Sequence, residues 1–122
     1  MITLYHGSRH KFDFPEYHQC VEQRSNHRNG ELGLWFSMSP EWIGGFGEFV
    51  YVFDADYISP YVLPLHELAK WANVEDFDYR QKRLDLLALG HDLILLEEKD
   101  GSVDMGVVLD FSTIKNFQLL RK

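Results

Sequence analysis

The first chemically informative stretch of the sequence is LYHGS, residues 4–8, which continues the apolar run that begins at Ile2. A glycine lets the backbone N–H and C=O approach a bound group that any side chain would obstruct. Gly7, between His6 and Ser8 at the end of a predicted strand, can therefore border a bound group. The alternative is that His6 only forms a hydrogen bond within a turn, where Gly7 supplies a positive φ.

Aromatic residues form a second group with possible chemistry. The stretch GLWFS, residues 33–37, contains Trp35 and Phe36, and Phe46 follows eleven positions after Trp35. Two aromatic faces can hold a cationic ring between them, and tryptophan is the strongest partner for a cation. Trp35 and Phe46 are thus residue types that can stack on such a ring. The alternative is that both are ordinary core aromatics in a chain rich in them.

Read in order with MGVVLDFSTI, residues 105–114, these stretches resemble the successive motifs of the ADP-ribosyltransferase fold. The resemblance runs from end to end. It is closest to the group of diphtheria-type toxins and poly(ADP-ribose) polymerases, whose signature is a histidine, a tyrosine and a glutamate on three strands. It implies a single domain over residues 1–122, of the α+β class, built as a split antiparallel β-sandwich with a few short helices.

The resemblance also implies how NAD, the substrate of such enzymes, would bind. His6 would contact a ribose hydroxyl, the backbone of Gly7 would hold the nicotinamide carboxamide, and Ser37 would bond to the same amide. Trp35 stands where the family has its first tyrosine, so it keeps the stacking surface and lacks the phenol hydroxyl. The residues implied in NAD binding are His6, Gly7, Ser8, Trp35, Phe36, Ser37 and Phe46.

The catalytic carboxylate is where the chain departs from the family pattern, because Met105 occupies the position of the glutamate. Cleavage of the nicotinamide–ribose bond passes through an oxocarbenium-like state, so a carboxylate must offset the developing charge. The candidates are Glu97, Glu98 and Asp104. Adjacent strand residues point to opposite faces, so only one of the two glutamates can face the site. We favour Glu98, whose side chain reaches further than that of Asp104. Alternatively, the stretch 97–100 is a solvated turn.

These features predict an NAD-dependent ADP-ribosyltransferase that modifies a macromolecule, in our interpretation a protein. Transferases of this size occur as toxins of toxin–antitoxin systems and as phage or mobile-element effectors, including inhibitors of CRISPR defence. An antitoxin or a host defence protein is therefore an expected partner. One alternative is a binding module that keeps the fold without chemistry. Another is a relative of RNA 2′-phosphotransferases, which also consume NAD, although the sparse basic residues disfavour it.

Other polar residues are weaker candidates. Arg9, Arg24 and Arg28 could contact the NAD pyrophosphate, since an arginine fork matches phosphate oxygens. The remaining group, His10, His18 and His27, lacks the spacing and the companion carboxylates of a dedicated metal site. We expect no metal.

The elements that must position these residues follow from the sequence pattern. Short apolar or β-branched runs predict strands at 2–5, 32–37, 48–55, 92–98, 103–110 and 114–120. A short helix is expected after Ser39 and Pro40, a second from Pro64 to Ala72, and a third from an Asp76 or Asp78 cap to Gly90. Strands at both ends with helices between them indicate the α+β class. Asp100-Gly101 suits a tight hairpin turn.

The overall composition limits the class of protein. The chain has 122 residues, of which 45% are hydrophobic and 15% aromatic, as expected for one ordered domain. Its net charge is −7 and its pI is near 5.2, which disfavours binding to a nucleic-acid backbone. A single cysteine, Cys20, and the absence of a signal peptide or a membrane-spanning apolar run predict a soluble protein of the cytoplasm.

Overall fold

The computed structural model describes residues 2–8, 11, 13–17, 29–39 and 49–121. Its strands are β1 (Ile2–Ser8), β2 (Leu34–Ser37), β3 (Phe49–Ala55), β4 (Pro60–Pro64), β5 (Leu93–Glu97), β6 (Val103–Val108) and β7 (Ile114–Arg121). The helices are α2 (Leu65–Ala72) and α3 (Tyr79–Ala88), with short 3₁₀-helices η1 (Asn29–Leu32) and η3 (Phe111–Thr113). The helix expected after Ser39 and Pro40 lies outside the described residues.

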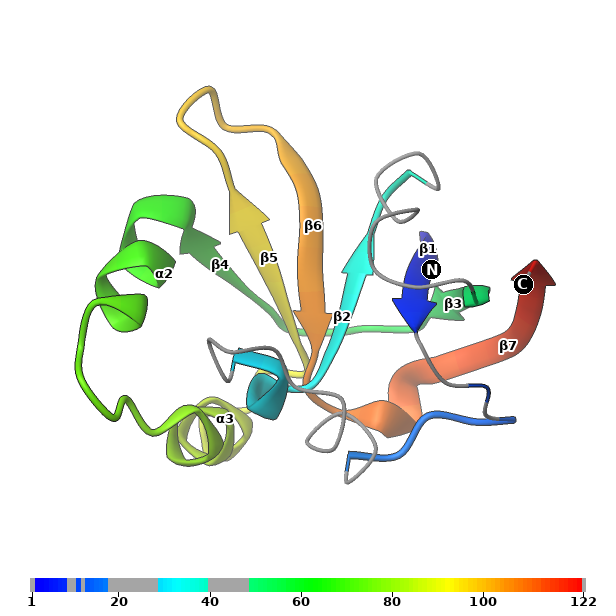
Figure 1. The fold of residues 1–122 in the computed structure, drawn as a ribbon, viewed down its shortest axis with the longest axis horizontal. Coiled ribbons are helices and arrows are strands. Elements are labelled where there is room, and N and C mark those ends of the chain that lie inside the picture. Colours follow the sequence, from blue (N-terminus) through cyan, green and yellow to red (C-terminus); the bar gives the residue numbers. More distant parts are fainter. Residues whose placement is uncertain (1, 9–10, 12, 18–28, 40–48, 122) are drawn as a thin grey trace.

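The strands pair into a seven-stranded sheet in the order β4-β5-β6-β2-β1-β3-β7. Every neighbouring pair is antiparallel except β4 and β5, which are parallel because α2 and α3 carry the chain back across between them. Figure 1 shows the helices beside β4 at one end of the sheet and β7 at the other. The α+β class is confirmed. The hydrogen bonds, however, form one mixed sheet where a split antiparallel sandwich was expected.

Two core clusters cover the two faces of this sheet. The first core cluster draws on β5, β6, β2, β1, β3 and β7, that is, on every strand of the sheet except the edge strand β4. The second lies on the opposite face and packs against the two helices. The first core cluster is Leu4, Leu34, Phe36, Phe53, Ala55, Leu93, Val108 and Ile114. The second is Leu32, Leu63, Tyr79, Leu86, Ile94, Leu96, Val107 and Leu109.

Local signals predicted most element positions within a few residues. Asp78 is the N-cap of α3, since its carboxylate accepts a hydrogen bond from Gln81 N at 3.0 Å, and Gly90 follows the helix with φ of 91°. Strand β1 extends three residues further than expected, to Ser8. Strand β4 was missed because prolines bracket it. Proline is tolerated there because β4 is the edge strand.

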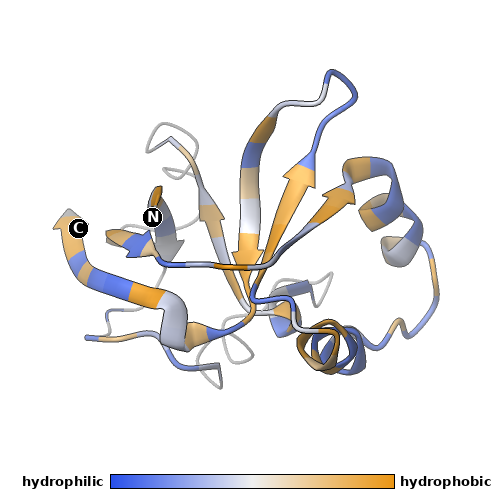
Figure 2. Cartoon of the chain, turned by 180° about the vertical axis from the view of Figure 1, so that it is seen from behind, coloured by the Kyte–Doolittle hydropathy of each residue, from blue (hydrophilic) through white to orange (hydrophobic). Residues whose placement is uncertain are grey.

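The hairpin between β5 and β6 turns at Asp100-Gly101, as predicted. Gly101 has φ of 86°, and its N–H donates to the Glu98 carbonyl at 2.9 Å. Figure 2 shows hydrophobic residues along β5 and hydrophilic residues at this tip. The tip is therefore solvated, while the base of the hairpin lies in the core.

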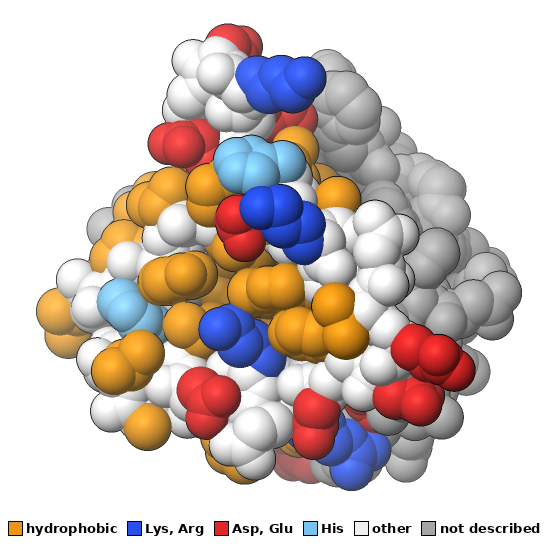
Figure 3. Space-filling view, turned by 90° about the vertical axis from the view of Figure 1, so that its left-hand side faces the viewer, with side chains coloured by type: hydrophobic (Ala, Val, Ile, Leu, Met, Phe, Trp, Pro, Cys, Tyr) orange, Lys and Arg blue, Asp and Glu red, His pale blue; other side chains and the backbone are white. Residues whose placement is uncertain are grey.

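The end of the molecule formed by β4, α2 and α3 carries a mixed surface. Figure 3 shows hydrophobic side chains there among basic, acidic and histidine side chains. Val62 of β4 and Leu84 of α3 are exposed, and none of the residues of α2 is fully buried. No helix in the described ranges is long and apolar enough to span a bilayer.

Candidate functional site

His6 lies where the sheet is most weakly joined. On one side, β1 pairs with β3 along its whole length, including His6 with Tyr51. On the other side, β1 and β2 share one paired position, Tyr5 with Ser37. One residue beyond that pair, His6 Nδ1 donates a hydrogen bond to the Trp35 carbonyl oxygen at 2.5 Å. A side chain therefore bridges the two strands where their ladder stops.

The protonation state of His6 follows from this environment. Burial lowers the pKa of the imidazole to about 4, while the hydrogen bond to Trp35 opposes the change. The ring is therefore neutral at physiological pH. Because a carbonyl oxygen only accepts, Nδ1 carries the proton, and Nε2 is the accepting nitrogen. Such a nitrogen can accept a bond from a hydroxyl group.

Gly7 and Ser8 continue β1 opposite Val50 and Phe49. Gly7 has no positive φ, since Gly33, Gly90 and Gly101 are the described glycines that do. His6 bonds across 29 residues of sequence rather than within a turn. The simple turn interpretation of His6-Gly7 is therefore wrong, and these residues belong to a regular strand. The Ser8 side chain is buried.

Trp35 and Phe36 point to opposite faces of β2. The indole Nε1 of Trp35 donates to the Asn29 carbonyl at 2.9 Å, and the ring packs partly buried against the second core cluster. Phe36 belongs to the first core cluster and is 3% exposed. Both rings thus contribute to packing, Phe36 inside the first core cluster and Trp35 partly buried against the second. Phe36 offers almost no accessible surface for stacking.

Ser37 ends β2 and is buried. Its Oγ donates to the Ser39 carbonyl at 2.8 Å and accepts from Ser39 N at 3.1 Å, so it shapes the bend after the strand. Several other candidates lie outside the described residues. They are Phe46, Arg9, Arg24, Arg28, His10, His18 and His27.

The three candidate carboxylates lie together on the β5–β6 hairpin. Glu97 is the last residue of β5, two positions after Leu95, which packs against the first core cluster. Asp104 is exposed in β6, two positions before Gly106, which pairs with Phe36. A register shift between Leu96 and Glu97 pairs Glu97 with Val103, so the regular alternation of the inner hairpin does not extend to Glu97 and Asp104.

Glu98 lies just beyond β5, where its N–H donates to the Ser102 carbonyl at 2.9 Å. It closes the turn and is exposed. Strand β2 ends at Ser37, opposite Met105, so the outer hairpin projects beyond it (Figure 1). Of these three residues, Asp104 is the one whose backbone contacts the end of β2. Its backbone carbonyl accepts a hydrogen bond from Met38 N at 2.8 Å. The turn also holds Asp100, whose pKa is lowered by hydrogen bonds from Ser102.

Sequence reasoning missed a buried acid, Glu31. Its side chain is 1% exposed, and its Oε1 lies 3.3 Å from Arg80 Nε of α3. The Tyr17 hydroxyl donates to the Glu31 backbone carbonyl. Glu31 directly precedes the apolar run that forms β2, and that position was the signal available in the sequence.

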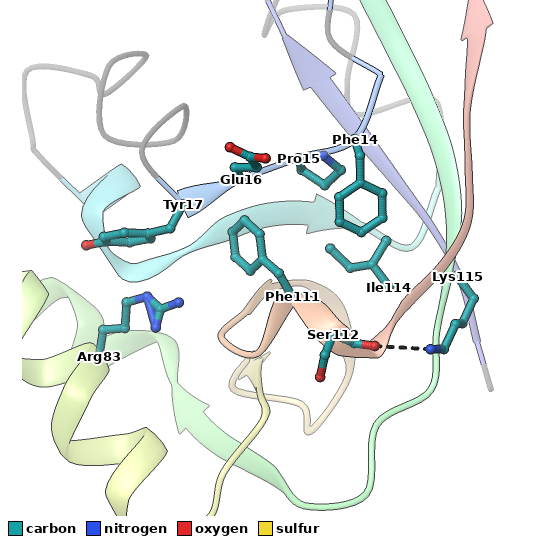
Figure 4. Close-up of a pocket in the computed structure, with 9 residues that line it drawn as sticks. All are labelled: Phe14, Pro15, Glu16, Tyr17, Arg83, Phe111, Ser112, Ile114 and Lys115. Atoms are coloured by element: carbon teal, nitrogen blue, oxygen red, sulfur yellow. Dashed lines mark hydrogen bonds between the residues drawn. The ribbon is translucent and has the colours of Figure 1, made fainter.

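A pocket of about 560 Å³ lies elsewhere on the described part of the molecule. Figure 4 shows Arg83 beside Tyr17 and Phe111, and the Arg83 guanidinium lies 4.3 Å from the centre of the Tyr17 ring. Its lining residues are Phe14, Pro15, Glu16, Tyr17, Arg83, Phe111, Ser112, Ile114 and Lys115. None of the sequence-predicted site residues is among them. Within the described ranges, no cluster of three or more His, Cys, Asp or Glu side chains is arranged to hold a metal ion.

Comparison with known proteins gives a structural likeness alone. No family model and no curated protein matches the chain. A solved structure described as the crystal structure of an anti-CRISPR protein superposes with a TM-score of 0.58 at 14% identity. The match covers 98% of this chain and 95% of that one. At this identity the likeness shows that the two chains share a fold over nearly their whole length.

Proposed function

We propose that this chain is an ADP-ribosyltransferase that consumes NAD and modifies a protein of a host defence system. The observation that carries the proposal is the arrangement of His6. His6 is a neutral imidazole whose Nδ1 donates to the Trp35 carbonyl oxygen and whose Nε2 is of the accepting type, and it lies where β1 and β2 share a single paired position. A ribose hydroxyl is a suitable donor for that nitrogen.

The fold offers further support. The first core cluster joins the β5, β6 and β2 side of the sheet to the β3 and β7 side, and β1 and β2 share one paired position. A sheet that is weakly joined between β1 and β2, with one core cluster shared by the strands on both sides, is consistent with the split sandwich of an ADP-ribosyltransferase. The mixed hydrogen-bond pattern is compatible with this arrangement, because the parallel pair lies at the far edge.

The proposed reaction needs few groups. The bond between the ribose C1′ and the nicotinamide nitrogen breaks, and its electron pair leaves with neutral nicotinamide. A carboxylate from the group Glu97, Glu98 and Asp104 offsets the positive charge that develops on the ribose. A nucleophile of the acceptor protein then bonds to C1′ and releases its proton to solvent. Asp104 lies beside the end of β2, where its backbone carbonyl accepts from Met38 N, whereas Glu98 is an exposed residue of the turn.

A protein acceptor suits the charge and the structural likeness. The net charge of −7 opposes broad binding to nucleic acid. The similar fold of a protein described as an anti-CRISPR protein supports a host defence component as the target. The reaction would then take place in the cytoplasm of the infected bacterial cell.

The test is nicotinamide release and label transfer. Purified protein is incubated with biotin-labelled NAD and an extract of bacteria that carry a CRISPR system, and labelled proteins are identified by mass spectrometry. We expect transfer by the natural chain and by His91→Ala, a matched control whose histidine lies near Tyr61 and Ser59. We expect none from His6→Ala. Equal transfer by both variants would contradict the role of His6.

A binding module without chemistry is the second candidate. It is favoured by Met105 at the family's glutamate position and by the packing of Trp35 and Phe36 into the core. The same experiment separates the two. The binding module would be favoured if the chain captured a defence protein from the extract while that protein stayed unlabelled and no nicotinamide was released.

A further inference from the structure

Glu31 and Arg80 form the contact from which a new inference starts. The Glu31 carboxylate is 1% exposed, whereas the Arg80 side chain is 56% exposed. A buried carboxylate is stable only when it is paired or hydrogen-bonded. The 3.3 Å contact between Arg80 Nε and Glu31 Oε1 therefore holds η1 against α3.

η1 in turn holds Trp35. The carbonyl of Asn29, at the start of η1, accepts the indole N–H of Trp35 at 2.9 Å. Two residues after Asn29, Glu31 is anchored by Arg80 through its side chain and by Tyr17 through its backbone carbonyl. Since a 3₁₀ turn is short, movement of Glu31 shifts the Asn29 carbonyl with it.

Trp35 then reaches His6. The indole fixes one end of Trp35 to η1, and its backbone carbonyl accepts from His6 Nδ1 at 2.5 Å. The contacts run continuously from α3 to β1: Arg80, Glu31, η1, Trp35 and His6. Each member of this series is joined to the next by an ion pair, a hydrogen bond or the backbone itself.

We propose that Arg80 and Glu31 are positioning residues that set the orientation and tautomer of His6 through η1 and Trp35. Neither residue was expected at the site from the sequence. Their bearing on catalysis rests on the proposed function, whereas the coupling itself is a property of the folded chain. It can therefore be measured without NAD.

The experiment follows two nuclei by NMR in the full chain. The indole N–H of Trp35, assigned by its loss in Trp35→Phe, reports on the bond to Asn29. The ¹⁵N shifts of the His6 ring, assigned by their loss in His6→Gln, report on the tautomer. In Arg80→Met we expect the Trp35 indole to exchange with solvent about tenfold faster or more, because η1 opens locally. The His6 ring should lose its pure Nδ1–H form.

Two variants control for the loss of charge and of stability. Lys82→Met removes a cation from the same helix, and Lys82 lies 5.1 Å from the centre of the Trp71 ring. It should shift the Trp71 indole and leave Trp35 and His6 unchanged. Arg80→Lys keeps a cation and should restore much of the Trp35 protection. If Arg80→Met does not fold, the Trp35 indole exchange and the His6 tautomer are measured in the milder variants Arg80→Lys and Glu31→Gln instead.

The outcomes separate this inference from the proposed function. Unchanged Trp35 exchange and an unchanged His6 tautomer in a folded Arg80 or Glu31 variant would overturn the coupling. Altered signals in the Arg80 and Glu31 variants, together with no nicotinamide release by the natural chain, would support the coupling and count against the enzyme. In an active enzyme, Arg80→Met should lower the transfer rate while Lys82→Met keeps it.

Discussion

Phe36 and Gly106 face each other across the β2–β6 ladder, and the Phe36 ring occupies the space that a side chain at position 106 would need. A Cβ at Gly106 would lie 2.5 Å from Phe36 Cζ and 2.1 Å from the Ile94 carbonyl oxygen. The second contact is with backbone of β5, which cannot rotate away. The glycine thus allows β5, β6 and β2 to pack closely beneath the first core cluster.

Gly106→Ala should therefore destabilise the fold. We expect the free energy of unfolding to fall by about 3 kcal/mol or more, since overpacking a filled core costs roughly 1–3 kcal/mol even where side chains can adjust. Chemical denaturation measures the change. Gly90→Ala is the matched control, because Gly90 has a positive φ and nothing within 4 Å of its added Cβ. It should cost about 1 kcal/mol from backbone strain. Equal losses in the two variants would contradict the packing argument.

His6 should make stability depend on pH. The pKa of His6 is lowered to about 4 in the folded state, from 6.5. Between these values the unfolded chain binds a proton that the folded chain does not, so the free energy of unfolding rises with pH. The slope due to His6 is at most about 1.4 kcal/mol per pH unit.

Urea titrations at several pH values between 4.5 and 7 test this, with His6→Gln as the comparison. The variant should show a shallower rise than the natural chain. Asp54 and Asp100, whose pKa values are lowered by hydrogen bonds, titrate below this window and affect both proteins alike. Identical slopes would mean that His6 is not held neutral by burial.

Gly7→Val should weaken NAD binding while the fold persists. Gly7 lies in regular β1 without a positive φ, so valine fits the backbone, but its side chain would obstruct a ligand held against the strand. We expect the affinity to fall by more than about tenfold, or roughly 1.4 kcal/mol. Calorimetry with NAD measures it, and near-ultraviolet circular dichroism checks the fold. Unchanged affinity would remove His6-Gly7-Ser8 from the site.

One of three isosteric changes, Glu97→Gln, Glu98→Gln or Asp104→Asn, should abolish transfer and leave NAD affinity within a few fold. The carboxylate acts on charge that develops as nicotinamide leaves, so its loss affects the rate rather than ground-state binding. Removing such a contact costs about a hundredfold to a thousandfold in rate. Glu67→Gln in α2, an exposed carboxylate of the same type, is the control. Full activity in all three hairpin variants would exclude this assignment.

The sequence by itself determined the features that depend on neighbouring residues. The capping carboxylate of Asp78, the stop at Gly90 and the turn at Asp100-Gly101 follow from backbone preferences that act over a few positions. The run from Ile2 to Tyr5 likewise predicted a strand that ends near His6. The α+β class followed from the order of such elements.

Tertiary structure decided what depends on distant partners. β4 is a strand because β5, about thirty residues later, supplies its hydrogen bonds, despite prolines at both of its ends. Glu31 is buried, and its carboxylate pairs with Arg80 of α3, about fifty residues later. Trp35 packs on the helical side, and Phe36 over Gly106, because the register of β2 with β6 assigns each side chain its face. Local sequence cannot encode these choices, since the groups that stabilise them come together only when the sheet closes.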